Sequence, residues 1–308
     1  MTTTTVTTDF ARWWADVLTV RRGGQDNFEA GPAPSAFPRL YGGQLVAQSL
    51  VAAAGTVEDG RAPNSIHASY LRGGDHSRPV DYRVQRLRDS RTLSTRLVHA
   101  EQEGHLLATA ICSFQRSDNA LRRQVEHDVP SEPPVGRPPD SLPTRGERLA
   151  SAFGAQVPAN AAPVWPVDVR YVDRAPWEPP GDGTPGAPRN RLWFRAAPVP
   201  DGPVLPDVPL MHAAALAFAT DQPMFEPVLF PHQLEWTEMI AGRSVYGASL
   251  DHTVWFHRPV RFDDWLCLSQ TAPVAAGTRG FCRAEVRSED NQLVASVAQE
   301  IAFAEPRA

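Results

Sequence analysis

The sequence predicts an α+β fold in which one unit, a helix followed by antiparallel strands, occurs twice. Each half of the chain contains an alanine-rich apolar segment with helical spacing, followed by segments typical of β-strands. A proline-rich stretch, residues 118–163, separates the halves. The length of 308 residues suits two domains of ordinary size.

The helix of the first half is expected at residues 43–57, where leucines and valines fall near the spacing of one helix face. The helix of the second half is expected at residues 209–220, where Pro209 suits the first turn. The strands expected after these helices are residues 65–71, 80–87, 93–101 and 105–115, and then 247–256, 265–271, 280–287 and 293–303.

The two halves can also be aligned residue by residue. Residues 106–112 match residues 293–299 in pattern, which places Arg96 and Arg283 at the same offset. Residues 67–71 match residues 252–256 after a slip of two residues. This agreement favours a duplicated unit.

Residues 118–163 are rich in proline, arginine, glutamate and serine, which excludes a continuous helix or a central strand. We therefore expect an N-terminal domain at residues 10–116, a linker at 117–163 and a C-terminal domain at 164–305. A further stretch of proline and glycine, residues 176–188, predicts a long loop in the second half.

Composition excludes several classes of protein. A net charge of -5 with a pI near 6.0 argues against a nucleic-acid partner. All 30 basic residues are arginine, so Schiff-base and P-loop lysine chemistry are excluded. Three widely spaced cysteines form no CxxC pair, residues 1–9 are threonine-rich without an apolar h-region, and no run of 18 apolar residues follows, so we expect neither secretion nor membrane spanning. We expect a reduced, cytoplasmic protein without a membrane partner.

Several familiar signals fail. Residues 247–251 begin like a nucleophile elbow, but the last glycine is missing and a strand follows. His252 and His257 are five apart on an expected strand, so they face opposite sides and cannot share a metal. The pair Gly42 and Gly43 lacks the rest of a dinucleotide fingerprint.

Three polar residues stand out in apolar surroundings. Asp221 follows an apolar helix, Ser249 opens an aromatic-rich strand, and Gln299 lies in the last strand, where the first half has Cys112. Each has an ordinary structural alternative: a solvated helix end, a strand start or a buried amide. The helix dipole does not favour a carboxylate at a helix C-terminus.

Five ordered motifs make the chain similar to a known family. The chain resembles the type-II (TesB-like) acyl-CoA thioesterases from about Trp13 to Phe303, with a linker that is longer than usual. Residues 41–44 resemble the family's FGGQ start with Tyr41 for phenylalanine, residues 67–75 its HSFHSYFLRPGD segment, residues 87–96 its LRDG and SxR strand, residues 251–259 its DHSxWFHRP signature, and residues 294–300 its VAS-x-x-QE motif.

The resemblance implies a double hotdog, in which two antiparallel sheets each wrap a central helix. It also implies hydrolysis of fatty-acyl-CoA by water, without a cofactor or metal, and assigns catalysis to Asp221, Ser249 and Gln299. In this interpretation Asp221 takes the proton of the water, while Ser249 and Gln299 orient it. No histidine base is supplied for Ser249 as a nucleophile, because His252 is expected on the other side of the strand.

Other contacts with the substrate are expected from the same resemblance. Oxyanion donors are expected at the start of the second helix, around residues 210–212. Gly43 and Gln44 either line the acyl tunnel or pack against the other repeat, and Arg258 and Arg279 either meet CoA phosphates or lie solvated at strand edges. The resemblance also implies a homodimer or homotetramer.

Two other functions remain open at this stage. A non-catalytic acyl-CoA binding protein would keep the fold, although it would have no need of the three polar residues. A hotdog hydratase or dehydratase would need a catalytic Asp–His pair, which Asp251 and His252 supply only in sequence.

Overall fold

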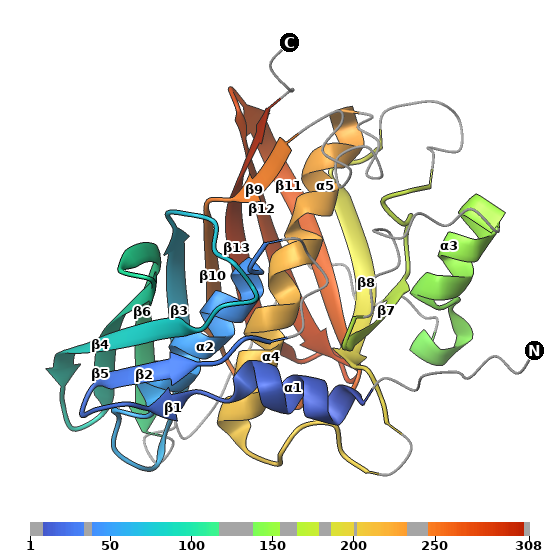
Figure 1. Ribbon diagram of the computed structural model, residues 1–308. Helices are drawn as coiled ribbons and strands as arrows, with labels where there is room; N and C mark the ends of the chain where they lie inside the picture. Colours follow the sequence, from blue (N-terminus) through green and yellow to red (C-terminus); the bar gives the residue numbers. More distant parts are fainter. Residues whose placement is uncertain are drawn as a thin grey trace, which may run out of the picture.

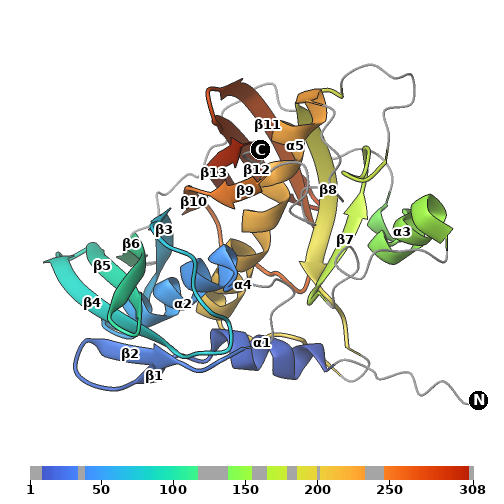
Figure 2. The same cartoon turned by 45° about the horizontal axis from the view of Figure 1, so that its top comes forward.

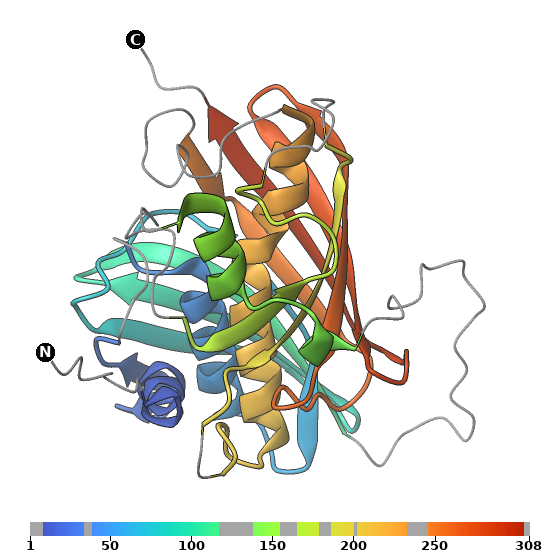
Figure 3. The same ribbon diagram turned by 90° about the vertical axis from the view of Figure 1, so that its right-hand side faces the viewer.

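The computed structural model describes residues 9–33, 39–116, 138–154, 165–178, 186–199, 202–232 and 246–304. Two helices, α2 (Gly42–Ala54) and α4 (Pro209–Asp221), pack against each other in the middle of the molecule. Strands of the first half wrap around one side and strands of the second half around the other (Figures 1 and 3). Both helices lie where the sequence predicts them.

Thirteen strands of the described residues form one antiparallel sheet. Outward from the middle, the order is β3-β6-β5-β4-β2-β1 in the first half and β10-β13-β12-β11-β8-β7 in the second, with β9 paired to β13. The strands are β1 (Arg21–Arg22), β2 (Asn27–Ala30), β3 (Arg61–Tyr70), β4 (Val80–Asp89), β5 (Leu93–Gln102), β6 (His105–Arg116), β7 (Val167–Tyr171), β8 (Arg189–Ala196), β9 (Tyr246–Ser249), β10 (Asp251–Phe256), β11 (Leu266–Ala276), β12 (Arg279–Ser288) and β13 (Leu293–Ala304).

The two halves join edge to edge. Strand β3 pairs with β10, and Ile66 faces Val254 across this junction. The same strand order on both sides of the junction confirms the predicted duplication, and each half has the helix wrapped by a sheet that defines a hotdog unit. The expected two sheets are therefore continuous through β3 and β10.

Both central helices are buried on nearly all sides. In α4 every residue from His212 to Asp221 is buried, and alanine dominates because the helix touches the sheet on one side and α2 on the other. Each helix has 13 residues. No helix in the described part of the chain is long and apolar enough to cross a membrane.

Several elements were not predicted. Helix α1 (Phe10–Leu18) packs Trp13 and Trp14 against Phe218 of α4, with ring centroids 5.4 and 5.1 Å away. Strands β7 and β8 extend the second half of the sheet. Helix α3 (Arg145–Phe153) lies on the outside, beyond β7 (Figure 2).

Helix α3 corrects the interpretation of the proline-rich stretch. It falls between two proline clusters and begins at a capping box, in which Thr144 and Glu147 satisfy each other's backbone amides. A nine-residue helix therefore fits within the expected linker. Residues 117–137 and 155–163 of that linker, and residues 179–185 of the expected loop, lie outside the described residues.

The expected single strand at residues 247–256 is divided by a β-bulge. Ser249 faces Ile301 and Thr253 faces Ala298, so four steps along β9 and β10 oppose three steps along β13. One extra residue reverses the alternation of side chains. This reversal matters for the site described below.

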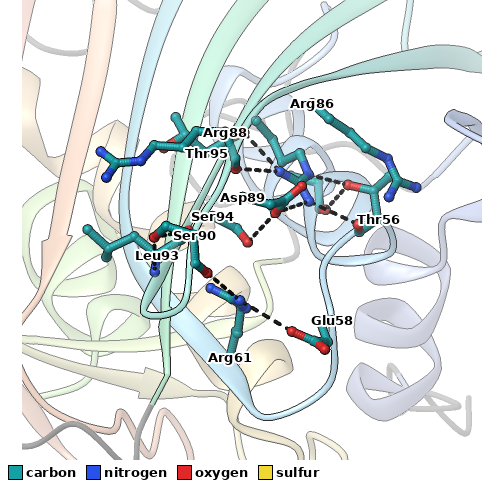
Figure 4. Close-up of polar contacts among 12 residues, drawn as sticks. Thr56, Glu58, Arg61, Arg86, Arg88, Asp89, Ser90, Leu93, Ser94 and Thr95 are labelled. Atoms are coloured by element: carbon teal, nitrogen blue, oxygen red, sulfur yellow. Dashed lines mark hydrogen bonds and ion pairs between the residues drawn. The ribbon is translucent and has the colours of Figure 1, made fainter.

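Arg96 is not the counterpart of Arg283. Arg96 faces Cys112, whereas the residue that faces Gln299 is Cys282. The predicted offset is wrong by one because the paired residues Cys282 and Gln299 are one position further apart in the chain than the paired residues Arg96 and Cys112. The Arg96 side chain is buried and donates hydrogen bonds to Thr56 and Asp89 at 2.7 and 2.9 Å, whereas Arg283 is exposed. Figure 4 shows Thr56 and Asp89 among the polar contacts of this region.

Glu226 is a buried carboxyl that opens α5 (Glu226–Leu229), just beyond the 3₁₀ turn that continues α4. Tyr171 Oη donates a hydrogen bond to one carboxyl oxygen at 2.7 Å, and Asn190 Nδ2 donates to the other at 2.8 Å. Burial raises the pKa of Glu226 to about 7.

Replacing Glu226 with glutamine is expected to stabilise the protein at alkaline pH. The carboxyl holds its proton more tightly in the folded chain, with a pKa of about 7, than in the unfolded chain, near 4.5. The free energy of unfolding therefore falls as pH rises between these values and stays low above them. Glu226→Gln should exceed wild type by about 2 kcal/mol at about pH 8, from roughly 1.4 kcal/mol per unit of pKa with allowance for relaxation.

Calorimetric melting of both proteins at about pH 5 and pH 8 measures this difference. The advantage of the variant should be present at the higher pH and smaller at the lower. An equal difference at both pH values would contradict the prediction, because it would mean that the pKa of Glu226 is the same in the folded and unfolded chain.

Candidate active site

The structure brings together the three polar residues that the resemblance identified. Asp221 ends α4, Ser249 ends β9 and Gln299 lies in β13. Ser249 Oγ donates a hydrogen bond to Asp221 Oδ1 at 2.9 Å, and Gln299 Nε2 donates to Ser249 Oγ at 2.9 Å. Asp221 and Gln299 are buried, and Ser249 is half-buried.

His252 belongs to the same cluster, contrary to the expectation that it faces away. Because of the β-bulge between Ser249 and Thr253, His252 points inward, and its Nδ1 lies 2.6 Å from Gln299 Oε1. Its Nε2 lies 3.1 Å from Thr220 Oγ1. Sequence alternation missed this residue, and only the pairing register reveals it.

The hydrogen bonds of the cluster all run in one direction when Asp221 is ionised, since a carboxylate only accepts. Ser249 then donates to Asp221 and accepts from the amide of Gln299. The Gln299 oxygen in turn accepts from His252 Nδ1. Burial lowers the pKa of His252, so a neutral imidazole with its proton on Nδ1 fits this chain of donors.

The start of α2 completes the site from the first half of the chain. A β-carbon on Gly42 would lie 2.8 Å from Asp221 Oδ2, and one on Gly43 would collide with the backbone oxygen of Phe218. Glycine is therefore required at both positions for close approach. The backbone N–H of Gly43 hydrogen-bonds Asp221, and the positive end of the α2 dipole favours the charge that the end of α4 does not.

The environment of Asp221 raises its pKa. Burial is the main cause, and it outweighs the stabilisation of the charge by His252, Ser249, Gly43 and Gln299. A carboxyl with a raised pKa beside a hydroxyl and an amide suits a general base.

The expected oxyanion donors lie at the wrong end of α4. Residues 210–212 occupy its first turn, about 15 Å from Asp221 at 1.5 Å per residue. His212 Nδ1 there accepts the Phe262 amide at 3.1 Å. The helix start that lies beside Asp221 belongs to α2.

Two tyrosines of the first half surround the end of α4. Tyr41 Oη donates to the backbone oxygen of Phe218 at 2.9 Å and accepts the Gln222 amide at 3.0 Å, so it bridges the halves. Tyr70 ends β3, and its hydroxyl lies beside Asp221. Tyr70 lies in the motif at residues 67–75, but the sequence does not reveal its place in the site, because its neighbour Asp221 comes from the other half of the chain.

Of the other expected binding residues, Arg258 and Arg279 have partners outside this cluster. Gln44 is buried in the first turn of α2. Arg258 donates to the backbone oxygen of Leu293, about 20 Å along β13 from Gln299. Arg279 is exposed and pairs with Glu300 at 3.2 Å.

A pocket borders the last turn of α4. Its lining combines apolar side chains from β7, β8 and α4 with polar groups of Arg145, Gln222 and Tyr171. The lining residues are Arg145, Trp165, Val167, Val169, Tyr171, Leu192, Phe194, Ala219, Gln222 and Pro223.

Comparison with known families finds two matches in chain order. Residues 30–115 match the acyl-CoA thioesterase N-terminal domain, and residues 129–303 match the acyl-CoA thioesterase C-terminal domain. The second match alone covers more than half of the chain.

Individual relatives agree with these matches. Acyl-coenzyme A thioesterase 8 of Mus musculus is 31 % identical over 273 residues, covering 85 % of this chain and 79 % of its own length. The crystal structure of acyl-CoA thioesterase II TesB2 from Mycobacterium marinum is 28 % identical, with a TM-score of 0.71 over 96 % of this chain and 98 % of its own. A hotdog-fold protein from Alicyclobacillus acidocaldarius, 19 % identical, shares the fold with a TM-score of 0.72 over 96 % of this chain and 98 % of its own. The chain belongs to the type-II acyl-CoA thioesterase family.

Proposed function

We propose that this chain hydrolyses fatty-acyl-CoA to a free fatty acid and CoA with a water molecule activated by Asp221, Ser249 and Gln299. The observation that supports this best is the one-way chain of hydrogen bonds that ends on the buried carboxylate of Asp221. A chain of this kind holds a base and its neighbours in a single orientation.

The reaction follows from these positions. Asp221 takes a proton from water as the water oxygen bonds to the thioester carbon, while Ser249 and Gln299 fix the direction of attack. The carbon–sulfur bond then breaks, and CoA leaves as a thiolate. Because a thiol has a pKa of about 8.5, the thiolate leaves readily and then takes the proton held by Asp221.

Direct attack by Ser249 has less support. His252 contacts Gln299 rather than Ser249, so no histidine base reaches the hydroxyl. A dehydratase-type Asp–His pair is also unsupported, because Asp251 accepts the Glu300 amide at 2.8 Å while His252 bonds Gln299 and Thr220.

Replacing Asp221 with asparagine is expected to lower kcat by at least about 100-fold, since general base catalysis contributes roughly 10²–10⁴. Asparagine keeps the size of the side chain but cannot take the proton. Thiol release from acyl-CoAs of increasing chain length measures the loss and also reports the preferred acyl group.

Ser249→Ala serves as the comparison. Under a water mechanism Ser249→Ala retains measurable turnover. Rapid quenching and mass spectrometry of the wild type should then trap no acyl-enzyme. Full activity of Asp221→Asn would contradict the role of Asp221. Binding without turnover in wild type would instead favour the acyl-CoA binding protein of the same fold.

The pH profile of kcat/KM is expected to carry the signature of Asp221. Only the ionised carboxylate acts as a base, and burial raises its pKa above the ordinary 3.8. Activity should therefore rise with pH along an acid limb whose midpoint lies above 3.8. Asp251→Asn, which removes a neighbouring half-buried carboxyl, should leave this limb in place. If the acid limb shifts in Asp251→Asn, the catalytic base would be Asp251 and the role of Asp221 would be contradicted.

We also propose that the chain has two domains, at residues 10–116 and 164–305. In addition, we propose that it forms a homodimer or homotetramer through the outer face of its sheet. Ile111 and Trp255 are 45 % and 38 % exposed there, on either side of β3. Trp255→Asp should lower the mass measured by light scattering, whereas Leu87→Asp, on exposed β4, should not. A monomeric wild type would contradict the proposal.

A further inference from the structure

The hydroxyl of Tyr70 lies in the candidate active site without a hydrogen-bond partner among the described residues. A β-carbon placed on Gly42 would be 3.0 Å from Tyr70 Oη and 2.8 Å from Asp221 Oδ2. Both oxygens therefore border the same small space. The hydroxyl oxygen is buried although part of the tyrosine is exposed.

An unpaired buried hydroxyl lowers stability. Leaving such a group without a partner costs about 1–3 kcal/mol, and phenylalanine would fill the same volume without that cost. Burial also raises the pKa of Tyr70 well above its ordinary value, so the hydroxyl keeps its proton and remains a donor. A partner that arrives with the substrate accounts for a hydroxyl in this place.

Three donors of the site described above are already engaged. Ser249 donates to Asp221, and Gln299 donates to Ser249. The backbone N–H of Gly43 also hydrogen-bonds Asp221. The negative charge that develops on the thioester oxygen needs a donor, and the Tyr70 hydroxyl is a buried donor without a partner among the described residues.

We propose that Tyr70 is a further catalytic residue, whose hydroxyl donates a hydrogen bond to the thioester carbonyl oxygen as that oxygen becomes negative. The proposal rests on the thioesterase function proposed above. Water still supplies the new carbon–oxygen bond and Asp221 still takes its proton. Tyr70 keeps its own proton throughout and stabilises the charge.

This role makes the site depend on both halves of the chain. Asp221, Ser249 and Gln299 come from the second half, whereas Tyr70 and the start of α2 come from the first. In this arrangement the carbonyl carbon faces the water on Asp221 and the carbonyl oxygen faces Tyr70 Oη, two side chains that both border the space beside Gly42.

The test compares Tyr70→Phe with Tyr82→Phe in the full chain. Tyr82 is a buried tyrosine of the first half whose hydroxyl bonds Gln48 at 2.6 Å, outside the site. Tyr70→Phe should lower kcat by at least about ten-fold with little change in KM, since removal of one oxyanion donor costs up to roughly 10²–10³. It should not lower the melting temperature, whereas Tyr82→Phe should lower the melting temperature and leave kcat near wild type.

Two inhibitors separate a catalytic from a binding role. A trifluoromethyl ketone analogue of acyl-CoA mimics the tetrahedral intermediate, and a thioether analogue mimics the substrate. Tyr70→Phe should weaken binding of the ketone by the same factor by which it lowers kcat/KM, and it should leave binding of the thioether unchanged.

Wild-type kcat in Tyr70→Phe, or equal weakening of both inhibitors, would overturn the proposal. If wild type itself releases no thiol from any acyl-CoA, the proposed function fails instead. The two failures are thereby distinguished.

Discussion

The close approach of the start of α2 to the end of α4 is the constraint on which the site depends. Gly42 and Gly43 permit it, because any side chain there would strike Asp221, Tyr70 or the backbone of Phe218. Tyr41 then holds the two ends together by bonding both Phe218 and Gln222. One consequence is electrostatic. The carboxylate at the unfavourable end of its own helix lies at the favourable end of another. The site is thus a product of how the halves pack, and neither half contains it alone.

Burial of a charge requires that its neighbours be organised, and the polarity of the cluster shows how this is achieved. An ionised Asp221 accepts from Ser249, which obliges Ser249 to accept from Gln299 and Gln299 to accept from His252. A neutral His252 suffices, and its burial keeps it so. Among the described residues, no second charge needs to be buried beside the carboxylate, and a second charge would carry its own desolvation cost. Orientation is fixed by dipoles, and the pKa of Asp221 stays raised.

The sequence predicted those parts of the fold and site that local pattern determines. The two central helices and most of the long strands follow from apolar spacing, and Asp221, Ser249 and Gln299 follow from motifs. What it missed depends on pairing across the chain. A one-residue β-bulge turns His252 inward. A one-residue difference between the two hairpins means that Arg283 is not the counterpart of Arg96. Strands β7 and β8 are short or lie among proline and glycine. The hydroxyl of Tyr70 has meaning only beside a carboxyl some 150 positions away.

Duplication followed by divergence explains why the described residues hold the cluster once. The two central helices have equal length, so Asp221 corresponds to Ala54, and Gln299 corresponds to Cys112. The first half therefore has neither the base nor the amide. The reverse loss occurs at the helix starts, where Gly42 and Gly43 correspond to Pro209 and Leu210. A leucine side chain there prevents the approach that the glycines allow. The second half has kept the reacting groups, and the first half has kept the glycine-containing helix start that packs against them. Each half therefore retains what the other lacks.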